Sequence, residues 1–368
     1  MSDKKFKIGI THGDTNGIGY EVILKALEDN RLLELCTPVV YGSAKAAAFY
    51  RKTAQLQPVS FTQIADASDA KNGEYSIINV VDESLHIEPG VESPEAGKAA
   101  FAALERAVAD LRAGKIDALV TAPINKHNIQ SPEFTFPGHT EYLESSLADD
   151  ECPRALMILC TDILRVALVT IHTPISAIPA KITRENVVEK IKDFNLSLTK
   201  DFGCHRPRIA VLSLNPHSGE GGLIGSEETE IISPAIAEAQ AEKINVFGPY
   251  ASDGFFGNGL FRKFDGVLAM YHDQGLAPFK TLAMDAGVNL TAGLPYVRTS
   301  PDHGTGYDIA GRGVADGESM RQAIYRAIDV LRCRRSHREA TANPLKKQYF
   351  EKNKKDNVVL DLTKSDTD

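Results

Sequence analysis

Residues 93–121 read SPEAGKAAFAALERAVADLRAGKIDALVT, an amphipathic helix followed directly by a short buried strand. Ser93 is a typical N-cap, Pro94 suits the first helical position, and Gly114 is a typical terminator. Apolar residues between them recur every three or four positions, as on one face of a helix. Residues 116–121 are apolar nearly throughout, which is typical of a strand covered on both faces. This unit of helix and buried strand predicts an α/β protein.

The same two patterns alternate along most of the chain. Further helices are expected at 184–198, 226–243 and 319–333, with a kink in the second at Pro234. Strands that alternate with helices predict an α/β fold with a largely parallel sheet. The other apolar runs that we interpret as buried strands are 7–11, 37–42, 76–81, 165–171, 208–214 and 264–270.

The length of 368 residues is sufficient for two domains with substantial cores. Pro123, Pro137 and Gly138 interrupt the alternating pattern, so we expect a hinge within residues 122–140. The expected division is a first α/β domain of residues 1–138 and 300–345, a second α/β domain of residues 139–299, and a charged C-terminal tail of residues 346–368, which begins after a last exposed helix.

Composition excludes several classes of function. A formal net charge of −8 leaves no electrostatic footprint for nucleic acid or an anionic membrane. No segment has the length and apolar character of a signal peptide or a spanning helix. The five cysteines form no C-x-x-C pair, which argues against a disulfide framework or a thiolate zinc site. We therefore expect a soluble, cytoplasmic protein with reduced thiols and a small-molecule substrate.

Three apolar runs are each followed within a few residues by a histidine. These are His172 after 165–171, His217 after 208–214 and His272 after 264–270. Ligands of open α/β sheets bind beyond the carboxyl ends of the strands, so side chains delivered there can meet at one point. A single histidine in such a place is more often packed or solvated, but three with the same placement favour a shared site.

Three neutral imidazoles without a nearby cysteine suit zinc or another borderline divalent ion and leave a coordination position for substrate. Magnesium, cobalt, manganese and nickel are alternatives. Two more strand ends carry polar residues, Lys126 and His127 after one, His12 and Asp14 after another. Each pair suits a solvated loop or a capped turn as well as a functional site.

Two glycine-rich loops differ in what they predict. The loop 13–19, GDTNGIG, lacks the G-x-G-x-x-G spacing, and the following strand ends without an acidic residue for a ribose, so we interpret it as a tight turn. The loop 300–313, SPDHGTGYDIAGRG, combines glycines with His, Asp and Thr, which favours close approach of a nucleotide to the backbone. Its candidate cofactor-binding residues are Asp302, His303, Gly304, Thr305 and Asp308.

The chain resembles the 4-hydroxythreonine-4-phosphate dehydrogenase family of pyridoxal phosphate biosynthesis. The resemblance covers roughly residues 6–333. The matching segments are THGDTNGIGYEV (11–22), VTAPINKH (120–127), FPGHTEYL (136–143), VTIHTPI (169–175), LNPHSGEGG (214–222), GPYASDGFF (248–256), YHDQGLAPFK (271–280) and NLTAGLPYVRTSPDHGTGYDIAG (289–311). The sequence departs from the family at Thr15 and Tyr20, where proline is usual, which puts the conformation of that turn in question.

The resemblance implies a fold like that of isocitrate and isopropylmalate dehydrogenases, with two α/β/α domains, an active-site cleft between them and a homodimer whose subunits share each site. It implies NAD or NADP as cofactor and one divalent metal per site, most often zinc. The implied metal ligands are His172, His217 and His272; the implied substrate-binding residues are His139, Thr140, Lys280, Asn289 and Arg298; and the implied catalytic residues are Lys280 and Asp253.

The implied reaction is oxidation of 4-phosphooxy-L-threonine to a 3-keto acid that loses carbon dioxide to give 3-amino-2-oxopropyl phosphate. One alternative keeps this chemistry but acts on a phosphorylated four-carbon sugar acid or an aromatic cis-dihydrodiol, of which Lys280, Arg298 and His139 favour the phosphorylated substrate. Another alternative is a three-histidine zinc hydrolase, or a phosphate-ligand-binding protein without redox chemistry. The loop 302–311 favours a dehydrogenase over it, since hydrolysis needs no dinucleotide.

Overall fold

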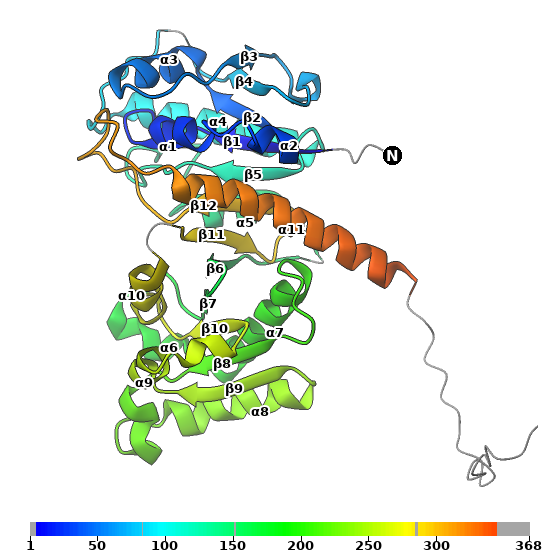
Figure 1. The fold of residues 1–368 in the computed structure, drawn as a ribbon. Helices are drawn as coiled ribbons and strands as arrows, with labels where there is room; N and C mark the ends of the chain where they lie inside the picture. Colours follow the sequence, from blue (N-terminus) through cyan, green and yellow to red (C-terminus); the bar gives the residue numbers. More distant parts are fainter. Residues whose placement is uncertain (1–4, 83, 151, 284–285, 344–368) are drawn as a thin grey trace, which may run out of the picture.

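The computed structural model describes residues 5–82, 84–150, 152–283 and 286–343 (Figure 1). Its strands form one 12-stranded sheet in the order β3-β4-β2-β1-β5-β12-β11-β6-β7-β10-β8-β9, with helices on both faces. The expected tail of residues 346–368 lies outside the described residues. The strands are β1 Phe6–Thr11, β2 Cys36–Gly42, β3 Phe61–Gln63, β4 Tyr75–Asn79, β5 Ala118–Thr121, β6 Leu156–Cys160, β7 Arg165–Leu168, β8 Arg208–Leu212, β9 Asn245–Tyr250, β10 Gly266–Ala269, β11 Val288–Ala292 and β12 Val297–Pro301.

The helices α3, α4 and α7 begin at residues whose side chains cap them. Ser93 Oγ accepts a hydrogen bond from the Ala96 backbone N–H at the start of α4, and Thr183 caps α7 in the same way. The α-helices are α1 Gly19–Ala26, α2 Leu32–Leu35, α3 Ala44–Thr53, α4 Pro94–Arg112, α5 His139–Leu147, α6 Ile178–Lys181, α7 Arg184–Lys200, α8 Ser233–Ala241, α9 Ser252–Gly257, α10 His272–Ala283 and α11 Glu318–Ala342.

The α/β class and the largely parallel sheet are confirmed, and each apolar run interpreted as a strand forms one. Three pairings at the centre are antiparallel: β6 with β7, β6 with β11, and β11 with β12. Five strands were not predicted from the sequence: β3, β6, β9, β11 and β12. Polar residues of the site interrupt β11 and β12, and β6 belongs to a longer apolar stretch. The strands β3 and β9 lie at the two edges of the sheet and contain no continuous apolar run.

Two helix predictions need correction. The predicted helix 226–243 is a π-helix at Glu228–Ile232 followed by α8, so the irregularity precedes Pro234 instead of starting there. The last exposed helix predicted after residue 333 is the continuation of α11, which runs unbroken to Ala342. Because α11 packs beside β12 and β5 and also contacts α7, it links the two halves of the molecule.

The chain leaves the first half of the sheet after β5 and returns through β12, which pairs with β5 in parallel near the expected residue 300. One hydrophobic core cluster contains residues from both halves, including Val120 of β5, Leu290 of β11 and Leu268 of β10. The division into two domains stays a prediction.

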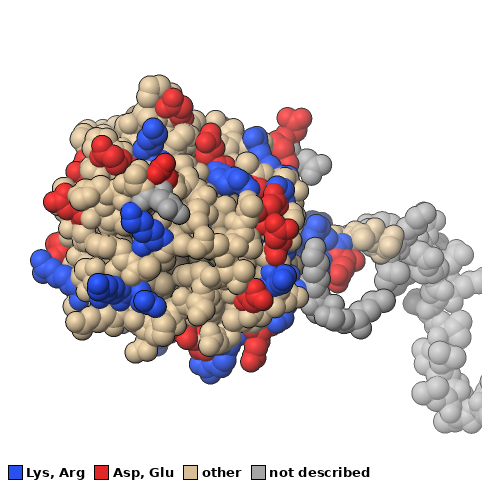
Figure 2. Space-filling view, turned by 90° about the horizontal axis from the view of Figure 1, so that it is seen from above, with Lys and Arg blue, Asp and Glu red and all other residues tan. Residues whose placement is uncertain are grey.

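On the face drawn in Figure 2, basic and acidic side chains are interspersed.

Candidate active site

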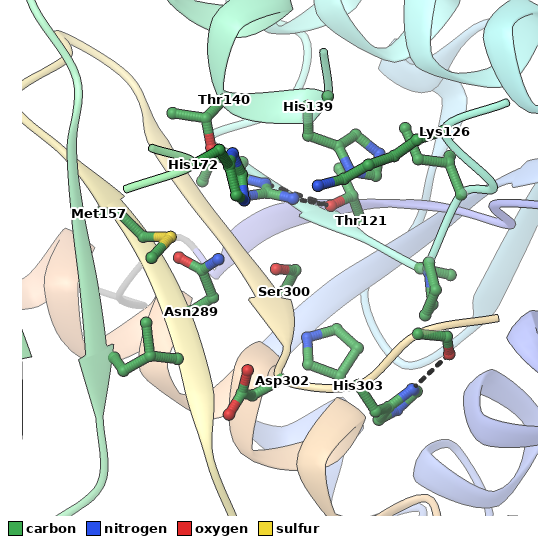
Figure 3. A pocket seen from close by; sticks show the side chains of 18 of the residues that line it. Thr121, Lys126, His139, Thr140, Met157, His172, Asn289, Ser300, Asp302 and His303 are labelled. Atoms are coloured by element: carbon green, nitrogen blue, oxygen red, sulfur yellow. Dashed lines mark hydrogen bonds between the residues drawn. The ribbon is translucent and has the colours of Figure 1, made fainter. Parts of the chain in front are cut away.

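A pocket of about 280 Å³ opens near the centre of the sheet, where β5, β11 and β12 meet α5 and α10. In Figure 3, Lys126 and His139 approach it from one side, and Asp302 and His303 from the other. The pocket is lined by Thr121, Ala122, Pro123, Ile124, Lys126, Gly138, His139, Thr140, Glu141, Met157, Leu159, His172, His272, Leu276, Lys280, Asn289, Arg298, Ser300, Pro301, Asp302, His303 and Gly304. It therefore brings together all five predicted substrate-binding residues.

Arg298 is a buried cation whose side chain donates hydrogen bonds to hydroxyl groups. The guanidinium donates to Thr121 Oγ1 from Nε (3.1 Å) and Nη2 (2.5 Å), and to Thr291 Oγ1 from Nη1 (3.0 Å). Burial lowers the pKa of Arg298 to about 9. The charge of Glu141 offsets only part of this effect, and the hydrogen bonds of the guanidinium go to hydroxyl groups and not to a carboxylate. A buried charge that is incompletely paired is costly, so the pocket favours an anionic ligand.

Three pocket side chains carry buried polar atoms without a hydrogen-bond partner. These atoms are His139 Nε2, Asn289 Oδ1 and His303 Nε2. Burial lowers the pKa of both histidines, and the nearby Arg298 and Lys126 lower that of His139 further. Because buried polar atoms nearly always have a partner, three unpaired ones around one pocket indicate a polar ligand.

The opposite wall contains Lys280 and Asp302. Lys280 Nζ lies 3.4 Å from Asp302 Oδ1, and it donates to the Asp302 backbone carbonyl at the same distance. Burial raises the pKa of Asp302, although the ammonium of Lys280 opposes that effect. This pair places an amine and a carboxyl group at the wall of the pocket.

Two of the three strand-end histidines reach the pocket, and their ring centroids are 6.1 Å apart. Asp273 Oδ1 lies 2.7 Å from His272 Nδ1, and Glu141 Oε1 lies 3.8 Å from His172 Nδ1. The interaction with His172 lowers the pKa of Glu141. At His272 the carboxylate lies within hydrogen-bond distance of Nδ1, an arrangement that leaves Nε2 free to bind a metal, whereas the contact at His172 is longer than a hydrogen bond.

His217 lies on a separate loop with unusual backbone geometry. Residues 217–221 all have positive φ, although three of them, His217, Ser218 and Glu220, are not glycine. The buried carboxylate of Glu228 holds the start of this loop, since its Oε1 accepts the backbone N–H of Leu214 (2.8 Å) and of Asn215 (2.7 Å). Strained backbone of this kind persists where the surrounding structure fixes it, often at functional sites.

Four predicted site residues do not line this pocket: His217, Asp253, Thr305 and Asp308. Asp253 is exposed in the first turn of α9, and Asp308 is exposed in the loop after β12. Among the described residues of this single chain, no three His, Cys, Asp or Glu side chains are placed to hold one metal ion. A metal site built from all three histidines therefore needs a second chain or a movement of the 217–221 loop.

Lys126 and Glu141 also line the pocket. The sequence had left the role of Lys126 open and had not indicated Glu141, although Glu141 directly follows the predicted pair His139 and Thr140 at the start of α5. His127, in contrast, does not line the pocket and pairs with Glu92 on the surface. The turn 13–19, which could have lined the cleft, contributes no residue to this pocket.

Comparison with known proteins identifies the family. The family described as "Pyridoxal phosphate biosynthetic protein PdxA" matches residues 34–327. A 4-hydroxythreonine-4-phosphate dehydrogenase from Bacteroides thetaiotaomicron is 55% identical over 367 residues, covering 100% of both chains. The chain belongs to the PdxA family. The predicted family and its dehydrogenase class are thus confirmed.

Two further relatives bear on the site. The crystal structure of a 4-hydroxythreonine-4-phosphate dehydrogenase from Klebsiella pneumoniae is 34% identical, with a TM-score of 0.76 over 90% of this chain and 99% of that one. A putative D-threonate 4-phosphate dehydrogenase from Oceanobacillus iheyensis is 40% identical over 89% of this chain and 98% of its own length. Within the described part of this PdxA family member, no helix is long and apolar enough to cross a bilayer.

Proposed function

We propose that this chain oxidises 4-phosphooxy-L-threonine with NAD or NADP to a 3-keto acid, which loses carbon dioxide to give 3-amino-2-oxopropyl phosphate. The observation that carries the proposal is the pocket in which the buried Arg298 lies with unpaired polar atoms of His139 and Asn289. A phosphorylated hydroxy acid supplies both the negative charge and the hydrogen-bond partners that these groups lack.

The anionic ends of the substrate have several partners. Arg298 offers a planar fork for a phosphate or carboxylate. His139 and Thr140 stand in the first turn of α5, whose backbone N–H groups have no side-chain cap and favour an anion. Lys126 adds a further positive charge at the same wall.

A divalent metal, zinc in our proposal, would be held by His172, His217 and His272. The donor set fits such an ion because imidazole nitrogen is a common zinc ligand and because Asp273 lies within hydrogen-bond distance of His272 Nδ1, which leaves Nε2 free to bind a metal. When bound, the ion would lower the pKa of the substrate hydroxyl and stabilise the enolate formed on decarboxylation. Lys280 is our candidate for accepting the hydroxyl proton, with Asp302 beside it to hold the amine in place.

The dinucleotide would bind against Asp302, His303, Gly304, Thr305 and Asp308. The fit rests on His303 Nε2, which is buried without a partner, and on Gly304, where a Cβ would meet no atom within 4 Å. When bound, NAD would accept the hydride from the substrate carbon. Since Asp302, His303 and Gly304 also line the substrate pocket, this loop can bring the two ligands together.

We further propose a cytoplasmic homodimer with sites shared between subunits. Ile175 and Leu223 are 80% and 81% exposed, and they follow His172 and His217 closely in the chain. Large apolar side chains this exposed beside functional residues are typical of a surface that a second subunit covers. His217 and the exposed Asp253, our second catalytic candidate, would then act with the pocket of the partner subunit.

A phosphorylated four-carbon sugar acid is the second candidate substrate, because the D-threonate 4-phosphate relative is 40% identical to this chain. The deciding experiment mixes purified protein with NAD or NADP and either 4-phosphooxy-L-threonine or D-threonate 4-phosphate, while NADH or NADPH absorbance is followed. A higher kcat/KM for the amino acid supports the first substrate, and the reverse supports the second. Absence of dinucleotide reduction with both would refute the dehydrogenase proposal.

The metal is tested by removing it. Chelator treatment followed by direct metal analysis should abolish activity, and adding back zinc should restore it. His217→Ala should lose the bound metal but keep the wild-type unfolding midpoint to within a few degrees. Full activity after verified removal, or an unchanged metal content in the variant, would contradict this part of the proposal.

A further inference from the structure

Glu21 of α1 is a fully buried carboxylate that accepts hydrogen bonds from backbone groups far away in the chain. Its Oε1 accepts the N–H of Gly311 at 2.5 Å, and its Oε2 accepts the N–H of Gly313 at 2.9 Å. Both glycines lie at the end of residues 302–313 (loop 302–313), which follow β12. The proposed dinucleotide-binding residues, from Asp302 to Asp308, lie in the first part of this loop. A single side chain thus fixes two backbone groups of that loop.

The rest of the same loop also rests on α1 and the turn before it. The backbone N–H of Ile18 donates to the carbonyl of Thr305 at 2.8 Å, and the Tyr307 hydroxyl donates to Asp14 Oδ2 at 2.8 Å. Lys25 Nζ donates to the carbonyl of Gly313 at 2.8 Å. The turn and α1 are therefore a platform on which the loop lies along most of its length.

Loop 302–313 needs such a platform for a physical reason. Gly311 and Gly313 have φ of 79° and 69°, a left-handed conformation that glycine adopts freely but does not hold by itself. A buried carboxylate, for its part, is costly unless hydrogen bonds satisfy both oxygens. Charge-assisted bonds from two backbone N–H groups meet both requirements at once.

We propose that Glu21 is a positioning residue for the dinucleotide: it holds loop 302–313 in the conformation that binds NAD. The inference rests on the proposed function, since it takes that loop as the cofactor site. The inference also gives a role to the turn 13–19, which lacks the G-x-G-x-x-G spacing of a dinucleotide-binding loop and lies outside the pocket. The turn and α1 hold loop 302–313 in place, and it is this loop, not the turn or α1, that contacts the nucleotide.

The test uses Glu21→Gln, which preserves shape but places an amide donor against a backbone N–H. Glu28→Gln is the matched control, because Glu28 is exposed just after α1. We expect the Kd for NAD, measured by calorimetry without substrate, to rise about tenfold in Glu21→Gln. Hydrogen exchange at Gly311 and Gly313 should accelerate, while metal content and the KM for the phosphorylated substrate stay within twofold. The control should match the wild type in all four measurements.

Glu21→Asp shortens the side chain by one methylene and keeps its charge, so it serves if Glu21→Gln does not fold. The inference is supported if the Kd for NAD rises less in Glu21→Asp than the tenfold expected for Glu21→Gln, and if substrate and metal binding are unchanged. An unchanged Kd for NAD despite faster exchange at Gly311 and Gly313 would overturn it, and so would an equal loss of NAD, substrate and metal binding. Failure of the wild type to bind NAD at all would instead refute the proposed function and, with it, the premise of this inference.

Discussion

Replacing Arg298 by methionine should make the ligand-free protein more stable while destroying its activity. Arg334 provides the matched comparison, because it is also buried but pairs with the buried Asp201, with 2.6 Å between Nε and Oδ1. The same substitution at these two arginines should therefore change stability in opposite directions.

The magnitudes follow from the surroundings of each side chain. Burial lowers the pKa of Arg298 from 12.5 to about 9, which corresponds to a cost of roughly 5 kcal/mol for the charged form. Methionine removes that cost but leaves the hydroxyls of Thr121 and Thr291 without their donor, a loss of about 1–3 kcal/mol in total. The net expectation for Arg298→Met is therefore a gain of about 2–4 kcal/mol in the free energy of unfolding. Arg334→Met strands Asp201 and should cost about 3–5 kcal/mol.

Urea unfolding of the ligand-free wild type and both variants measures the two changes in the free energy of unfolding. Arg298→Met should also lower kcat/KM by about 10²–10⁴-fold, the value of two charge-assisted hydrogen bonds to the substrate. Substrate should raise the unfolding midpoint of the wild type but not that of Arg298→Met. A loss of stability in Arg298→Met as large as that in Arg334→Met would refute the view that this arginine is held at a cost for binding.

Three other predictions concern separate parts of the molecule. His12 is buried, and burial lowers its pKa from 6.5 to about 4, so below pH 6.5 the unfolded state binds a proton that the folded state does not. The free energy of unfolding should thus fall by up to about 3 kcal/mol as the pH drops from 6.5 to about 4. Urea unfolding midpoints measured over this pH range should fall less in His12→Phe than in the wild type. Glu228→Gln should weaken zinc affinity about tenfold in a chelator competition, whereas the exposed Glu230→Gln should leave it unchanged. Lys126→Met should raise the KM for the phosphorylated substrate about tenfold and the KM for its unphosphorylated analogue less than twofold; equal effects on both would exclude a phosphate contact.

The sequence predicted most of the parallel strands and the well-capped helices because both have strong local signals. Ser93 and Pro94 mark the start of α4, and the mostly apolar run 116–121 needs no distant partner to be interpreted as a buried strand. The strand β12 has no such signal, since Arg298, Thr299 and Ser300 within it are polar. These polar side chains line the pocket or contact α11. Both surroundings exist only once the sheet has assembled, so the local sequence does not reveal them.

The candidate site was predictable to a different degree. Residues of quoted motifs, such as His139 and Lys280, lie in the pocket as expected. The pairing of Glu21 with Gly311 was beyond sequence reasoning, because it joins a carboxylate to backbone groups 290 residues away. Glu228 could not be predicted for the same reason. Its carboxylate takes the place of a backbone acceptor for N–H groups of the chain, and no pattern of side chains specifies such a contact.

The antiparallel strands at the centre of the sheet restrict how the protein can close on its ligands. Asn289 on β11 and Arg298 on β12 are held by a ladder that continues through β6 on one side and β5 on the other. Separating the two halves in order to open the pocket would break backbone hydrogen bonds along one of these ladders. Admission and release of substrate therefore fall to the loops around the rim, and the turnover rate should respond to mutations there more than to the stiffness of the sheet.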